Sequence, residues 1–94
     1  MLILTLTKKW FEKYVRGEKH TDYRVVKPYW TKRLFDINGK PKKECILQLG
    51  YSDKNRLHAD IVKIELLQSG AEIDLHCIEP VYAIHMANIK YMNS

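Results

Sequence analysis

The sequence has few cysteines, which can cross-link small folds, and few prolines and glycines, which interrupt helices and strands. It holds two cysteines, three prolines and four glycines among 94 residues. Cys45 and Cys77 lie far apart in apolar stretches without C-x-x-C spacing. We therefore expect reduced thiols, with neither a metal nor another cofactor. No apolar run reaches the roughly 20 residues that span a bilayer, so no membrane segment is expected. Residues 1–6 lack the basic start of a secretory leader, and a cytoplasmic location is the expectation.

Acidic residues are scarce in the first half of the chain. Residues 8–43 hold twelve Lys or Arg and four Asp or Glu, whereas residues 44–94 hold four and seven. The net charge of +5 therefore conceals a strongly basic half. Such a half suits a polyanionic partner, because phosphate contacts release counterions and steer encounters. Charge alone does not separate a nucleic-acid-binding protein from an ordinary basic one.

The apolar patterns predict an α+β fold with about five strands and two short helices in the N-terminal half. Residues 2–7 alternate as in a strand, and Gly17 is placed to end a helix over 8–16. Pro28 suits the first turn of a second helix. Further strands are predicted by β-branched and aromatic residues at 19–26, 44–50, 57–67 and 80–89. We expect a single domain, residues 1–94, whose curved sheet closes partly into a barrel.

The first predicted helix carries a compact aromatic run. Thr7 is placed to cap it, and Trp10, Phe11, Tyr14 and Val15 recur at a spacing that puts them on one face. An apolar helix face at this spacing ordinarily packs on the core. We therefore expect these aromatic side chains to be buried rather than to contact a ligand.

The stretch RGEKHTDYR, residues 16–24, alternates in sign and is the candidate site. Side chains alternate between the faces of a strand, which places His20, Asp22 and Arg24 on one face. Lys19 lies at the junction with the preceding turn. A carboxylate two residues before an arginine fixes its guanidinium and leaves other N–H groups for phosphate or a base edge. The alternative is a solvated ladder of ion pairs.

The segment GEKHTDYR resembles the G-x-K-x-x-E-x-R signature of ASCH domains, a branch of the PUA-like β-barrel superfamily. The resemblance covers most of the chain and is strongest over residues 4–35. There a W-F helix, the motif and KPYWTKRLF (residues 27–35) follow in the order of small bacterial and phage ASCH proteins. It implies a small PUA-like β-barrel with a cleft that binds RNA or a nucleotide. Lys19, Asp22 and Arg24 would line this cleft, with Asp22 in place of the usual glutamate.

A related branch with acetylcytidine amidohydrolase activity has a threonine nucleophile three residues after the motif lysine. Asp22 occupies that position here, and Thr21 is expected on the opposite face of the strand. A carboxylate does not replace an activated hydroxyl in amide cleavage. This departure argues against amidohydrolase chemistry, while RNA cleavage assisted by Lys19 and a nearby acid or histidine stays open.

Aromatic and basic residues outside the motif extend the candidate binding surface. Tyr29 and Trp30 stand among cations, a pattern that supplies stacking faces for bases beside phosphate ligands. The basic loop at 40–43 and the GYS connector at 50–52 either border the cleft or are plain solvated turns. The candidate nucleic-acid-binding residues are Lys19, His20, Asp22, Arg24, Lys27, Tyr29, Trp30, Arg33, Tyr51 and Ser52.

Three functions are consistent with these residues. We predict a small domain that binds RNA or a modified nucleotide in a basic cleft around Lys19, Asp22 and Arg24. A hydrolase or ribonuclease in the same cleft, with Lys19 and Asp22 as its catalytic groups, is the first alternative. The second alternative is a protein-interaction module whose basic half recognises an acidic surface.

Overall fold

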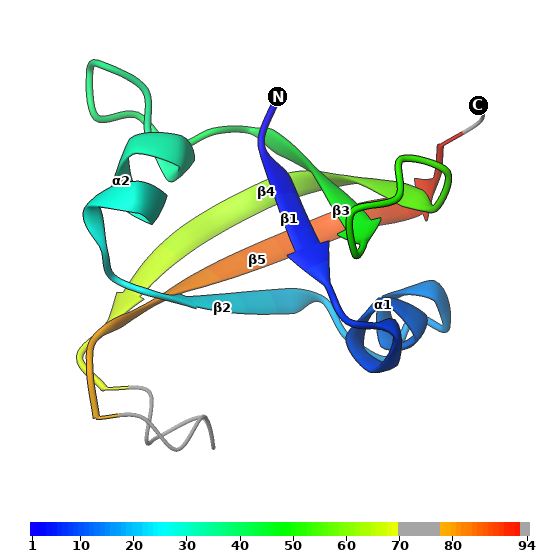
Figure 1. The fold of residues 1–94 in the computed structure, drawn as a ribbon. Coiled ribbons are helices and arrows are strands. Elements are labelled where there is room, and N and C mark those ends of the chain that lie inside the picture. Colours follow the sequence, from blue (N-terminus) through cyan, green and yellow to red (C-terminus); the bar gives the residue numbers. More distant parts are fainter. Residues whose placement is uncertain (70–77, 93–94) are drawn as a thin grey trace.

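The computed structural model describes residues 1–69 and 78–92. Within this part, the chain forms five strands and two helices, which confirms the predicted α+β class. In chain order (Figure 1) they are β1 (Ile3–Leu6), α1 (Lys8–Val15), β2 (Thr21–Val25), α2 (Pro28–Leu34), β3 (Glu44–Leu49), β4 (Arg56–Leu67) and β5 (Val81–Tyr91). None of the helices in the described residues is long and apolar enough to cross a bilayer.

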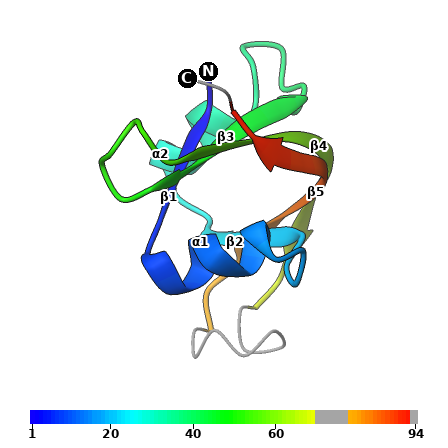
Figure 2. The same cartoon turned by 90° about the vertical axis from the view of Figure 1, so that its right-hand side faces the viewer.

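The strands form one sheet in the order β1-β3-β4-β5-β2. β1 pairs with β3 in parallel, and the other neighbours are antiparallel. The long β4–β5 pair shifts register between His58 and Asp60 and again between Ile61 and Lys63. Such irregularities bend and twist strands. The sheet curls into a half-barrel (Figure 2), which confirms the expected curvature and leaves β1 and β2 as its two edges.

The core fills the concave side of this sheet. Leu4 of β1, Leu47 of β3 and Ile84 of β5 are fully buried, and Leu34 adds the end of α2. α1 packs against β1, β3 and β5. Fully burying a leucine or isoleucine side chain contributes about 1.5 to 3 kcal/mol, so these contacts hold the edge strand β1 and both helices on the sheet, whereas β2 is joined to it by its pairing with β5.

The structure corrects the expectation that α1 buries its whole aromatic run. Phe11 and Tyr14 are buried, at 3% and 2% exposure, whereas Trp10 and Val15 are 42% and 41% exposed. Residues three apart share a narrow stripe of a helix, and a helix of this length lying on a curved sheet buries only that stripe. Trp10 therefore reaches the surface beside the core.

One of the two predictions made for the ends of α1 is confirmed. Gly17 adopts a left-handed conformation with a φ of 72°, which confirms its predicted role as the residue that ends the helix. Thr7 occupies the N-cap position in an extended conformation, but its side chain makes no capping hydrogen bond. The prediction that the Thr7 hydroxyl caps the helix is wrong, and this side chain faces a surface pocket instead.

Candidate functional site

A pocket of about 590 Å³ opens between the two edges of the curled sheet. We call it the seam pocket. Its walls come from three elements and one turn: residues 5–7 at the end of β1, Trp10 and Lys13 of α1, residues 18–19 of the turn, and residues 22–24 of β2. The curl of the sheet thus brings together segments that lie at opposite edges in the strand order.

Arg24 joins the two edges of the sheet. Its Nε donates to Oδ2 of Asp22 at 2.6 Å, and its Nη2 donates to the carbonyl oxygen of Thr5 in β1 at 3.1 Å. Its Cζ lies 4.8 Å from the ring centroid of Trp30, a cation–π contact that fixes the plane of the guanidinium. These two hydrogen bonds use two of the five guanidinium N–H donors and fix the orientation of the group. Arg24 therefore lines the pocket with a guanidinium that is already oriented and has three further donors.

Asp22 lines the seam pocket and is 5% exposed. Its side chain and that of Arg24 are 8% and 18% exposed, so this ion pair is largely shielded from water. The hydroxyl of Tyr14 is buried close to the same carboxylate, without a hydrogen bond of normal geometry to any residue that the structure describes. Burial, and then the charge of Asp22, raise the pKa of that hydroxyl, which keeps it protonated.

Lys19 extends its ammonium group into an aromatic surrounding. Nζ lies 5.4 Å from the ring centroids of both Trp10 and Tyr14 and 5.1 Å from that of Tyr23, and it donates to the carbonyl oxygen of Thr21. Burial lowers the pKa of Lys19, and the attraction of Asp22 opposes this shift. An anion in the pocket would favour the charged form of Lys19 and so raise its pKa again.

Trp10 forms a second feature that the sequence interpretation missed. It is 42% exposed and lines the seam pocket, and the ammonium groups of Lys9 and Lys13 lie 5.2 and 5.0 Å from its ring centroid. A half-exposed indole among ammonium groups is suited to stack a base while the lysines meet its phosphate. The available signal was the run KKWFEK, in which basic residues flank the tryptophan.

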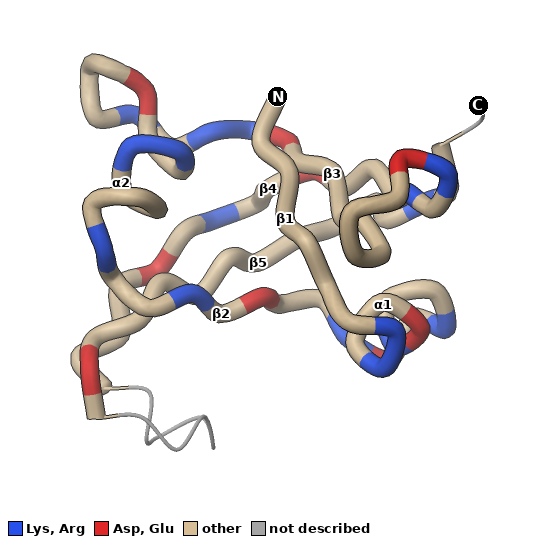
Figure 3. Tube along the Cα trace, viewed as in Figure 1, with Lys and Arg blue, Asp and Glu red and all other residues tan. Residues whose placement is uncertain are grey.

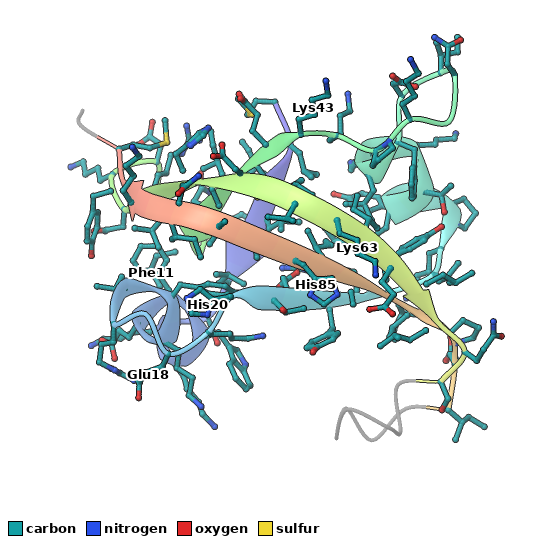
Figure 4. The ribbon with its side chains drawn as sticks, turned by 180° about the vertical axis from the view of Figure 1, so that it is seen from behind. Phe11, Glu18, His20, Lys43, Lys63 and His85 are labelled. Atoms are coloured by element: carbon teal, nitrogen blue, oxygen red, sulfur yellow. The ribbon has the colours of Figure 1, made fainter. Side chains whose placement is uncertain are left out.

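The structure brings three of the predicted residues, Lys19, Asp22 and Arg24, into one pocket. His20, labelled in Figure 4, does not join them: it precedes β2 and is exposed. It is not among the residues that line the seam pocket. Strand alternation places His20 with Asp22 only if the strand already includes residue 20, and β2 begins one residue later. Its backbone carbonyl instead accepts from the N–H of Met86 at 2.8 Å.

Thr21 points away from the pocket, as strand alternation predicts. Its hydroxyl is hydrogen-bonded to Nδ1 of His85 at 3.1 Å, and Nε2 of that ring lies 3.0 Å from Oε1 of Glu65. Figure 4 shows His85 on β5, on the side of the sheet seen from behind. The threonine next to the motif aspartate is thus engaged elsewhere and does not line the seam pocket.

The remaining predicted residues lie apart from the seam pocket. Trp30 does not line the seam pocket but contacts the guanidinium of Arg24, which does. Tyr29 and Arg33 line a second pocket at the other end of β1. Lys27 is exposed at the start of α2. Two residues of the GYS connector were predicted to contact the ligand, Tyr51 and Ser52. They are exposed in the turn between β3 and β4 and line neither pocket.

Metal-binding side chains do not gather in the described part of the chain. Within residues 1–69 and 78–92, no three His, Cys, Asp or Glu residues are placed to hold a metal ion. Cys45 is a buried free thiol, and burial raises its pKa to about 12, which makes it a poor nucleophile. Cys77 lies outside the described residues.

Comparison of the chain with protein-family models, with curated proteins and with solved structures gives no match.

Proposed function

We propose that this protein is a small PUA-like domain of the ASCH type that binds single-stranded RNA, or a modified nucleotide, in the seam pocket. The observation that supports it most is the arrangement of Asp22, Arg24 and Lys19. A largely buried carboxylate orients a guanidinium fork at the pocket wall, beside an ammonium group set among aromatic rings. Phosphate or base acceptors suit the fork, and Trp10 supplies a stacking face.

The charge of the pocket favours an anionic ligand. Three cations, Lys13, Lys19 and Arg24, line it together with two acids, Glu18 and Asp22. Asp22 is already paired with Arg24, and Glu18 pairs with Arg16 in the turn. The pocket lining therefore carries one more cation than acid, and each contact with a phosphate adds affinity that salt reduces.

A single substitution tests this proposal. Lys19→Gln removes one charge from the pocket, and we expect it to weaken binding of a labelled single-stranded RNA about tenfold, the value of one charge-assisted contact. Wild-type affinity should also fall as the pH rises through the lowered pKa of Lys19, because neutral Lys19 no longer attracts phosphate. Fluorescence anisotropy at low and moderate salt measures both effects.

Lys54→Gln provides the matched control, because it removes the same charge from an exposed position in the β3–β4 turn, outside the pocket. We expect this variant to bind within about twofold of wild type. Equal losses in the two variants would show that binding depends on net charge alone. Circular dichroism of each variant separates lost binding from lost folding.

A ribonuclease is the second candidate, favoured by the lowered pKa of Lys19, since a lysine shifted in this direction is suited to proton transfer. Amidohydrolase chemistry in the seam pocket has less support, because the Asp22 carboxylate is engaged by Arg24 and Thr21 does not line this pocket. RNA that is shortened by wild type and stays intact with Lys19→Ala would favour the nuclease over a binding domain.

A further inference from the structure

A second pocket, of about 370 Å³, lies at the N-terminal end of β1. It is lined by residues 1–3, by Tyr29, Lys32 and Arg33 of α2, and by Lys42 of the chain that leads into β3. We call it the α2 pocket. Figure 3 shows the basic segments of α2 and of the chain before β3 gathered beside this end of β1. Its walls, all within the described residues, hold three cationic side chains and no carboxylate, which suits an anion.

The loop between α2 and β3 brings the third cation to this pocket. Phe35 and Pro41 form an isolated antiparallel bridge, and the backbone N–H of Lys42 donates to the carbonyl oxygen of Leu34 at 2.8 Å. Lys42 is thereby held against the C-terminal end of α2. Lysine and arginine in a last helical turn stabilise the helix terminus. That effect accounts for Lys32 and Arg33, but it does not account for a third cation supplied by another segment.

A row of basic and aromatic side chains in contact with one another connects the two pockets. The guanidinium of Arg24, in the seam pocket, lies 4.8 Å from the ring centroid of Trp30. The Trp30 and Tyr29 rings meet edge to face, with centroids 4.9 Å apart. The guanidinium of Arg33, in the α2 pocket, lies 3.5 Å from the centroid of Tyr29, and its Nη1 donates to the carbonyl oxygen of that residue at 2.9 Å.

The row has the composition of a single-strand binding surface. Bases stack on aromatic rings and guanidinium planes, while cations along the path meet phosphates. Tyr29 is 54% exposed, so its ring is accessible to a base. Leu2 and Leu6 line different pockets and are four residues apart, about 13 Å at the rise of a strand. A strand of a few nucleotides covers such a distance.

We infer that one RNA strand runs from the seam pocket along the Arg24–Trp30–Tyr29–Arg33 row and places a phosphate in the α2 pocket. This inference rests on the proposed function and extends it from a single nucleotide to a strand. It predicts that affinity rises with RNA length until both pockets are occupied, at about four nucleotides or more. It also predicts that substitutions in the α2 pocket weaken the binding only of RNA that is long enough to reach this pocket.

The test uses a triple variant, Lys32→Gln, Arg33→Gln and Lys42→Gln, with a uridine dinucleotide and an oligouridine of about 12 nucleotides as probes. The control triple, Lys54→Gln, Lys63→Gln and Lys90→Gln, removes the same charge from exposed positions outside both pockets. We expect the first triple to bind the long strand at least about tenfold more weakly than the control does, with a salt slope smaller by about 0.7, the value of one phosphate contact on a single strand. The dinucleotide should bind the two triples equally, within about twofold.

Two results would overturn the inference, and they differ in what they say of the seam pocket. If the dinucleotide binds and the two triples bind the long strand alike, the seam pocket binds nucleotides and the path to the α2 pocket is wrong. If neither probe binds wild type, the proposed function fails, and the inference fails with it. Circular dichroism and thermal unfolding of both triples show that the comparison concerns folded proteins.

Discussion

Asp22→Ala is expected to lower the free energy of unfolding by about 2 to 3 kcal/mol, which for a domain of this size corresponds to a melting temperature about 10 to 20 °C lower. The Asp22 side chain is 8% exposed and accepts the Nε hydrogen of Arg24 at 2.6 Å. Its removal leaves a guanidinium that is 18% exposed without its carboxylate. Urea denaturation and calorimetry measure the loss.

Asp53→Ala is the control for this substitution, because Asp53 is an exposed acid in the β3–β4 turn. It should change stability by no more than about 0.5 kcal/mol. The double variant Asp22→Ala/Arg24→Ala should be more stable than the sum of the two single losses, because it leaves no unpaired charge. An Asp22→Ala protein as stable as the Asp53→Ala control would show that this pair is a solvated surface contact.

Trp10→Ala is expected to weaken binding of single-stranded RNA about 5- to 150-fold, the value of one base stacked on an aromatic ring. Trp10 is 42% exposed, so its loss should cost much less stability than the loss of the buried Phe11. Affinity from anisotropy and the free energy of unfolding from urea titration give the two quantities separately. Trp10→Phe should recover part of the affinity, because it restores a ring.

Tyr51→Ala is the matched control for an exposed aromatic residue. Tyr51 is 98% exposed, belongs to the turn after β3 and lines neither pocket. We expect its removal to leave RNA affinity within about twofold of wild type. A larger loss for Tyr51→Ala than for Trp10→Ala would place the binding surface at the GYS connector, where the sequence had suggested one border of the cleft.

The motif strand shows how much local sequence predicts. Asp22 and Arg24 are two residues apart in a strand, so their contact follows from backbone geometry alone. The position of Lys19 was open, because it precedes the strand, and its place in the pocket depends on the rings of Trp10 and Tyr23. His20 illustrates the limit, since a strand that begins one residue later removes it from the alternating pattern.

Tertiary geometry decided what local sequence did not. Helical spacing indicated one apolar face for α1, but the curved sheet buries Phe11 and Tyr14 and leaves Trp10 at the pocket. The contact between Arg24 and Thr5 joins segments at the two edges of the sheet, and strand order cannot be obtained from one sequence. The seam pocket exists because of that curl, and only Lys19 and the β2 wall were predicted from the motif.

The most direct measurement is a nuclear magnetic resonance titration of the isotope-labelled wild-type protein with single-stranded RNA. Binding in the seam pocket predicts that the largest shifts occur in the backbone amides of residues 5–7, 18–19 and 22–24 and in the indole N–H of Trp10. The exposed residues of β4, Val62 and Leu66, should stay unchanged. Shifts confined to β4, or none at saturating RNA, would contradict a binding site between the two edges of the sheet.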